Sequence, residues 1–190
     1  FAYQGIDMGA LMGDGTAMMG TFMDPIIHTE LSAERVWQLT LIIFAATLVA
    51  SLAGLFANPR IIERSLFRPY WFLRRKQYDT IVTSGFVHAD LPHLIFNMMT
   101  FWFFAFPLEK EIGPVRFALL YFLGLVVSDA GTYFKHRNDP QYASLGASGA
   151  ISAVLFAAIV YFPWMKLFII PIPLPIPAPL FAVAYVAYSW

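Results

Sequence analysis

The sequence contains no cysteine and few charged residues. Without cysteine the chain cannot form a disulfide or a thiolate metal site, and its compartment cannot be inferred from redox chemistry. Charged residues make up only 13% of the 190 positions, against roughly 25% in a soluble domain. The 12 basic residues balance the 12 acidic ones, which disfavours nucleic acid as a partner. With 59% hydrophobic residues, this composition indicates an integral membrane protein.

Long apolar runs separated by polar stretches predict an all-α, polytopic membrane helix bundle. About 20 consecutive apolar residues suffice to cross the hydrocarbon core as a helix. We expect complete spans at residues 36–57, 91–108, 115–134 and 144–162, and the beginning of a fifth span at 179–190. Residues 1–35 hold five acidic residues and no run of spanning length. They are expected to form a flexible or interfacial segment ahead of a membrane domain at 36–190.

Proline interrupts the apolar pattern near the end of the sequence. Five prolines occupy alternate positions from Pro171 to Pro179. Each removes a backbone donor and clashes with the preceding turn, so this run cannot be a helix. We expect it at the membrane surface or against protein. The last twelve residues, 179–190, reach only about 18 Å as a helix. The sequence is therefore expected to stop within the fifth span of a longer protein.

Basic and aromatic side chains are interleaved in the loop 58–90, where Arg74 and Arg75 follow Trp71. This mixture is typical of a loop at the level of the lipid headgroups, and we favour that interpretation over a dedicated binding patch. Eight of the 12 Lys and Arg residues fall on this side of the membrane. The positive-inside rule would place this side in the cytoplasm.

Polar residues on three of the predicted spans fall at one level of the membrane. His93 and Asn97 are four residues apart and share one face of the second span. Asp129 lies near the end of the third span and Ser148 near the start of the fourth. Polar groups inside spans usually face the bundle interior and mark functional sites. Their convergence in one leaflet predicts a water-accessible cavity, open toward the loop 58–90.

Two less specific explanations of these residues remain open. The small residues around Ser148, such as Gly146 and Gly149, also suit the close packing of membrane helices. His93 and Asn97 would likewise serve as structural hydrogen-bond partners between helices. A metal site is disfavoured, because His88 and His93 have neither cysteine nor a nearby carboxylate pair to complete it. The sequence predicts no cofactor.

Four short motifs resemble the rhomboid family of intramembrane serine proteases. They are Gly85-Phe86-Val87-His88, His93-Leu94-Ile95-Phe96-Asn97, Glu109 with Gly113, and Gly146-Ala147-Ser148-Gly149. They occur in the order found in the family and cover roughly 83–165. The resemblance implies a six-helix core in which a serine on the fourth helix is activated by a histidine on the sixth.

The resemblance also implies a role for each matching residue. Ser148 corresponds to the nucleophile, and His93 and Asn97 correspond to the side chains that stabilise the oxyanion together with the Ser148 backbone N–H. The expected partners are transmembrane segments of other proteins, which the enzyme would cleave, and the lipid bilayer; the oligomeric state stays open. We expect a bacterial cell membrane as the location. In the family the active site usually opens away from the cytoplasm, which conflicts with the distribution of basic residues.

Two features depart from the family pattern. None of the four histidines fits the base on the sixth helix, so residues 1–190 alone are expected to be inactive. The first loop has Tyr78-Asp79-Thr80 where the family typically has a Trp-Arg pair, which puts substrate entry in doubt. The alternative is a catalytically inactive rhomboid-like pseudoprotease that binds membrane clients. A channel or transporter has little support, because the polar residues line no full path.

Overall fold

The computed structural model describes residues 38–169 and 172–189, so the predicted segment 1–35 lies outside the described residues. Three helical segments are long and apolar enough to cross a membrane: Gln38–Ala57, Leu91–Ile112 and Pro114–His136. A fourth apolar helix, α9 (Ser148–Tyr161), has 14 residues. The predicted all-α membrane bundle is confirmed.

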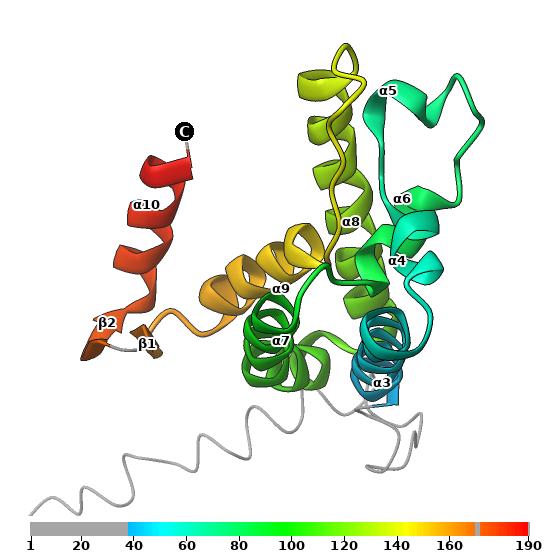
Figure 1. Ribbon diagram of the computed structural model, residues 1–190. Helices are drawn as coiled ribbons and strands as arrows, with labels where there is room; N and C mark the ends of the chain where they lie inside the picture. Colours follow the sequence, from blue (N-terminus) through cyan, green and yellow to red (C-terminus); the bar gives the residue numbers. More distant parts are fainter. Residues whose placement is uncertain (1–37, 170–171, 190) are drawn as a thin grey trace, which may run out of the picture. The chain divides into compact units, whose positions relative to one another are not determined.

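The elements follow one another along the chain as a first membrane helix, a loop of short helices, three further helices and a hairpin that leads into a last helix (Figure 1). They are α3 (Gln38–Leu52), continued as the π-helix η2 (Ala53–Ala57), α4 (Arg60–Ser65), α5 (Pro69–Phe72), α6 (Thr80–Thr83), the 3₁₀ helix η3 (Ser84–Phe86), α7 (Leu91–Ile112), α8 (Pro114–His136), α9 (Ser148–Tyr161), β1 (Lys166–Ile169), β2 (Ile172–Pro177) and α10 (Ala178–Ser189).

Each of the two membrane helices α3 and α8 buries one face and exposes large apolar residues on the other. On α3 the buried positions are Thr40, Ile43, Thr47 and Ser51, whereas Leu41, Ile42 and Val49 are exposed. On α8 the buried positions recur every four residues, at Phe117, Tyr121, Leu125 and Asp129, and the exposed ones at Leu119, Leu123 and Val127 do the same. This arrangement suits helices that pack on one face and meet lipid on the other.

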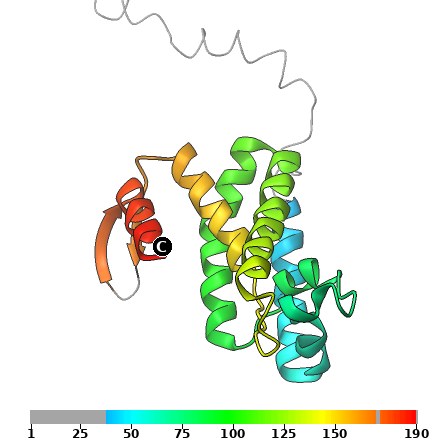
Figure 2. The ribbon, with the colours of Figure 1, turned by 90° about the horizontal axis from the view of Figure 1, so that it is seen from above.

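Helix α9 lies against both α7 and α8 (Figures 1 and 2). Its approach to α8 depends on two glycines. A Cβ at Gly124 would lie 2.6 Å from the Cβ of Ala153, and one at Gly149 would overlap the side chain of Ser128. Contacts this short do not occur between real side chains, so both positions require glycine. The predicted small-residue packing is therefore present beside Ser148.

The bounds of α7 and α9 differ from the sequence-based ones by four residues at one end. Helix α7 extends to Ile112, where Gly113 ends it with φ 81°. Helix α9 begins at Ser148, four residues later than expected. Ser144 instead pairs with Phe67 through two backbone hydrogen bonds of 3.0 Å, which ties the first loop to the start of α9.

The proline-rich stretch forms one strand of a hairpin and no helix over 172–177, as predicted. β2 pairs antiparallel with β1, with Leu167 opposite Ile176 and Lys166 opposite Pro177. The sequence analysis did not predict strands here. Proline is compatible with β2 because a two-stranded sheet leaves one edge of each strand without a partner.

Glu109 holds the beginning of α3 against the end of α7. Its side chain is completely buried. One carboxylate oxygen, Oε2, accepts a 2.8 Å hydrogen bond from the N–H of Thr40, and Oε1 accepts one of 3.3 Å from Leu39. N–H groups in the first turn of a helix have no helical partner, and within a membrane water cannot supply one. A buried carboxylate at this position also interacts favourably with the helix dipole.

We expect Glu109→Ala to destabilise the protein by about 2 kcal/mol, because it removes two charge-assisted hydrogen bonds and leaves buried donors unpaired. Glu111→Ala is the matched control, since Glu111 is exposed on the same end of α7. Thermal unfolding in detergent would compare the two variants. Equal losses would mean that the contact with α3 contributes nothing specific.

Candidate active site

Ser148 is the first residue of α9 and is exposed. The helix cannot begin earlier because Gly146 has φ +115°, a conformation that residues with a side chain rarely adopt. Among the described residues, no side chain caps this end of α9. The backbone N–H groups of its first turn are therefore available to an acceptor beside the Ser148 hydroxyl, where the helix dipole favours negative charge.

His93 and Asn97 occupy the first two turns of α7. Asp90 caps this helix, and its Oδ1 accepts a 2.8 Å hydrogen bond from the N–H of His93. The His93 ring is half-buried. Asn97 is buried, and its Nδ2 donates a 3.1 Å hydrogen bond to the His93 carbonyl. That bond uses one of the two amide hydrogens, and the second has no partner in the described part of the chain.

Gly146 brings the serine segment into contact with His93. A Cβ at this position would lie 2.7 Å from Cε1 and 3.1 Å from Nε2 of the His93 ring. The backbone two residues before Ser148 therefore rests on the ring, and only glycine leaves room for it. Of the three predicted spans with polar residues, the structure thus brings the second, with His93, into contact with the segment that leads into the fourth, with Ser148. No hydrogen bond joins the Ser148 hydroxyl to a histidine within residues 38–169 and 172–189.

Asp129 supports this segment through Ser84. Its Oδ2 accepts a 3.4 Å hydrogen bond from the Ser84 hydroxyl, and the Ser84 carbonyl accepts one of 2.9 Å from the N–H of Gly146. The hydrogen bond of Asp129 is thus with Ser84, which binds the backbone of Gly146, and not with Ser148 or His93. Through Ser84, Asp129 thus helps to position the segment that contains Gly146.

His88 is buried beside His93, a feature that the sequence analysis missed. The two rings meet edge to face with centroids 4.9 Å apart. The Ser51 hydroxyl donates to the carbonyl of Phe86 (3.2 Å) and lies 3.1 Å from Nδ1 of His88. Because a hydroxyl has one hydrogen, it accepts from Nδ1–H, and Nε2 is then an unprotonated acceptor. Nε2 has no partner among the described residues.

Burial, with a smaller contribution from the neighbouring His93, lowers the pKa of His88 to about 4, although Asp90 opposes the shift. His88 is therefore neutral at physiological pH. In the part of the chain that the structure describes, no group of three or more His, Asp and Glu residues could hold a metal ion.

Comparison with known proteins identifies the family. The family model described as the rhomboid domain matches residues 75–190, more than half of the chain. The chain belongs to the rhomboid family. The match includes α7, which carries His93 and Asn97, and α9, which carries Ser148. It also includes α8. This rhomboid is an integral membrane protein, as indicated by the three helices in the described part of the chain that are long and apolar enough to span a membrane.

Individual relatives differ in their printed names. "Putative rhomboid protease YdcA" of Bacillus subtilis is 39% identical over 71 residues, which is 37% of this chain and 35% of that protein. "RHOMBOID-like protein 12, mitochondrial" of Arabidopsis thaliana is 26% identical over 149 residues, 66% of this chain and 44% of the relative. "Inactive RHOMBOID-like protein 8" of Arabidopsis thaliana is 35% identical over 78 residues, 40% and 22% of the two chains.

This chain thus spans less than half the length of these relatives. Their names include both a protease and an inactive protein, and the family alone does not decide between the two.

Gly146→Ala should impair this rhomboid at its site. The new methyl group would displace the His93 ring and force a strained backbone, which we expect to cost about 2 kcal/mol of stability. Gly131→Ala is the control, because a Cβ there meets nothing within 4 Å and alanine favours the helix. Thermal unfolding in detergent should show a loss for the first variant and none for the second. An unchanged Gly146→Ala protein would contradict the contact with His93.

The stability of the protein should depend on pH through His88. Its pKa is lower in the folded protein than in the unfolded chain, so the unfolded chain binds the proton more tightly. The contribution of the uncharged His88 ring to the free energy of unfolding is fully present above pH 6.5. On the order of 3 kcal/mol of this stability is lost as the pH falls toward 4.

His88→Gln should be less stable than the wild type at pH 8, because it loses the bond with Ser51, but should lose less on acidification. Unfolding temperatures measured from pH 8 to pH 4 would test this. If the unfolding temperatures of the two proteins fell in parallel with pH, the pH dependence would not arise from His88.

Proposed function

We propose that the whole protein is an intramembrane serine endopeptidase that cleaves transmembrane segments of other membrane proteins. Ser148 is the nucleophile, and His93, Asn97 and the Ser148 backbone N–H stabilise the oxyanion. A histidine on the sixth helix, as the resemblance implies, acts as the base. No cofactor is needed for this chemistry.

The observation that carries the proposal is the contact of Gly146 with the His93 ring. This contact brings the segment that ends at the exposed Ser148 onto the ring of His93, and the buried Asn97 lies one turn further along α7. Preorganised donors of this kind stabilise the negative charge that develops when a hydroxyl attacks a carbonyl. Random packing of small residues would not require His93 or the free amide hydrogen of Asn97 at this place.

Each group has a defined task in the reaction. The base removes the proton of the Ser148 hydroxyl as its oxygen bonds to the carbonyl carbon of the scissile peptide. The carbonyl oxygen becomes an anion that the N–H donors and the two α7 side chains bind. The base then gives the proton to the leaving amine, and water releases the acyl group by the same steps.

A pseudoprotease is the alternative, and two observations favour it. The Ser148 hydroxyl has no histidine partner among the described residues, and one relative is named as inactive. Such a protein would bind membrane clients without cleaving them.

The membrane in which the protein resides is a further part of the proposal. A bacterial cell membrane is compatible with the Bacillus subtilis relative, whereas other relatives are named as mitochondrial. The helices themselves suit either membrane.

The proposal is tested with the full-length protein in liposomes that contain a transmembrane substrate. Ser148→Ala should reduce cleavage roughly 10³-fold or more, because it removes the nucleophile. Asn97→Ala should reduce it about 10²–10³-fold, because one oxyanion donor is lost. Ser152→Ala, one turn further along α9, is the control and should leave cleavage nearly unchanged.

Labelling by a fluorophosphonate provides a second measurement, since the reagent reacts with an activated serine. Labelling that requires Ser148 supports the protease. A folded full-length protein with neither cleavage nor labelling would replace it with the pseudoprotease. Retained cleavage together with a collapse of stability in Asn97→Ala would make Asn97 structural.

A further inference from the structure

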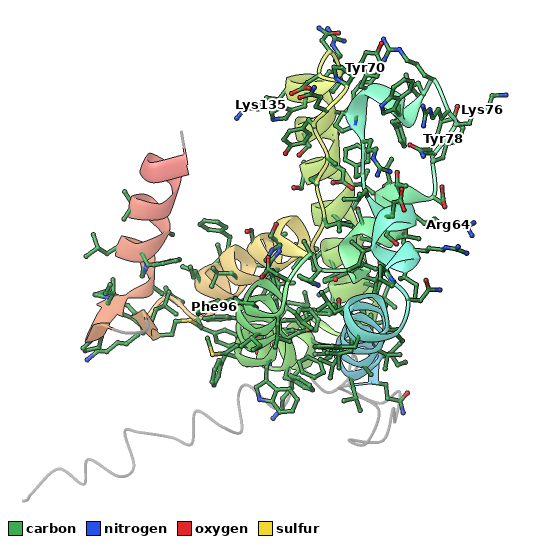
Figure 3. All side chains as sticks on the ribbon, viewed as in Figure 1. Arg64, Tyr70, Lys76, Tyr78, Phe96 and Lys135 are labelled. Carbon is green, nitrogen blue, oxygen red and sulfur yellow. The ribbon has the colours of Figure 1, made fainter. Side chains whose placement is uncertain are left out.

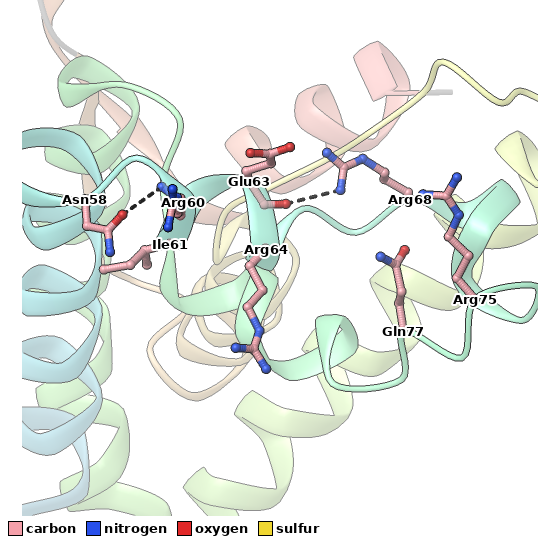
Figure 4. A pocket seen from close by; sticks show the side chains of 8 residues that line it. All are labelled: Asn58, Arg60, Ile61, Glu63, Arg64, Arg68, Arg75 and Gln77. Carbon is pink, nitrogen blue, oxygen red and sulfur yellow. Dashed lines mark hydrogen bonds between the residues drawn. The ribbon is translucent and has the colours of Figure 1, made fainter.

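A basic pocket lies in the first loop, on elements that the proposed catalysis does not use. It has a volume of about 630 Å³ (Figure 4). The residues that line it belong to the turn after η2, to α4 and to the segment around α5: Asn58, Arg60, Ile61, Glu63, Arg64, Arg68, Arg75 and Gln77. Four arginines and a single carboxylate thus surround one space.

The four guanidinium groups have no acidic partner in the described part of the chain. Arg68 Nη1 donates to the backbone carbonyl of Glu63 at 3.1 Å, and the Glu63 carboxylate pairs with none of them. The guanidinium of Arg75 lies 3.9 Å from the centre of the Trp71 ring. Two of the cations are therefore held in place, whereas Arg60 and Arg64 are exposed and their guanidinium groups make no hydrogen bond, ion pair or ring contact with the described residues.

Gln77 adds an unsatisfied polar group to the same space. Its side chain points toward the arginines in Figure 4. Its Oε1 is buried without a hydrogen-bond partner among the described residues. Guanidinium groups present donors in a fork that matches phosphate oxygens, and an additional amide can bind a hydroxyl next to the phosphate.

The position of the pocket indicates where the phosphate comes from. Asn58, which lines it, follows directly on the apolar segment Gln38–Ala57, so the pocket lies where the first membrane helix ends. The Trp71 ring lies against the guanidinium of Arg75, which lines the pocket, and the Tyr70 ring packs on Trp71; such aromatic residues are enriched at the membrane–water interface. At this level the abundant phosphate groups are those of lipid headgroups.

We propose that this pocket binds the phosphate group of an anionic phospholipid at the membrane surface. Arg60, Arg64, Arg68 and Arg75 surround the phosphate, and Gln77 contacts a polar headgroup group beside it. The bound lipid fixes the first loop relative to the end of the first membrane helix. This inference does not depend on the chemistry of Ser148.

The loop provides a matched pair of double variants. Arg60→Gln/Arg64→Gln removes two charges from the pocket. Arg74→Gln/Lys76→Gln removes two charges from the same loop, at residues that do not line it. Arg64 and Lys76 both project outward from the loop in Figure 3. General attraction to an anionic surface would respond equally to the two variants, whereas a pocket responds only to the first.

The experiment is a lipid titration of the detergent-solubilised full-length protein, followed by native mass spectrometry. The probes are dioctanoyl phosphatidylglycerol, dioctanoyl phosphatidylcholine and inorganic phosphate. We expect phosphatidylglycerol to bind at least about tenfold more tightly than phosphatidylcholine. Arg60→Gln/Arg64→Gln should weaken phosphatidylglycerol binding by about tenfold or more, and Arg74→Gln/Lys76→Gln by less than about threefold.

Three results would overturn the proposal. The wild type could bind phosphatidylglycerol and phosphatidylcholine equally, and this result does not depend on whether any variant folds. Both double variants could lose the same affinity, which would indicate diffuse electrostatics. Inorganic phosphate could displace phosphatidylglycerol at equal concentration, which would indicate a soluble anion as the ligand.

Discussion

The close approach of α9 to its neighbours depends on three positions that have no side chain. Gly124 and Gly149 let α9 meet α8, and Gly146 lets the preceding segment rest on His93. Membrane helices gain little from burying apolar surface against each other, because lipid is equally apolar, so contact distance determines how well they pack. A methyl group at any of these positions would separate the elements that carry the candidate site.

Oxygen acceptors from other parts of the chain bind backbone N–H groups at or near the starts of these helices. The buried Glu109 carboxylate accepts from the first turn of α3, the exposed Asp90 carboxylate accepts from the first turn of α7, and the Ser84 backbone carbonyl accepts from the N–H of Gly146. Each bond satisfies a group that hydrocarbon would leave unpaired. The start of α9 has no such side chain among the described residues, and its first backbone N–H groups are left available to an anionic group.

The sequence was sufficient to predict what the bilayer itself requires. Spans were recognisable because hydrocarbon demands long apolar runs, and His93 and Asn97 because polar residues are rare within them. The start of α9 was placed four residues too early, since the positive φ of Gly146 depends on a hydrogen bond to a distant loop. The pairing of His88 with Ser51 joins residues 37 apart and arises only from tertiary packing. No local sequence pattern predicts such contacts.

The hairpin before α10 has a consequence for association with other chains. Pro173, Pro175 and Pro177 leave β2 with backbone donors only at every second residue, and such donors point to one side of a strand. At most one edge of β2 can therefore donate hydrogen bonds. A second extended chain on the other edge would therefore meet no backbone N–H donors from these prolines and could not form a complete set of hydrogen bonds. This apolar segment is thereby protected from pairing with further strands, the route by which exposed edges nucleate aggregates.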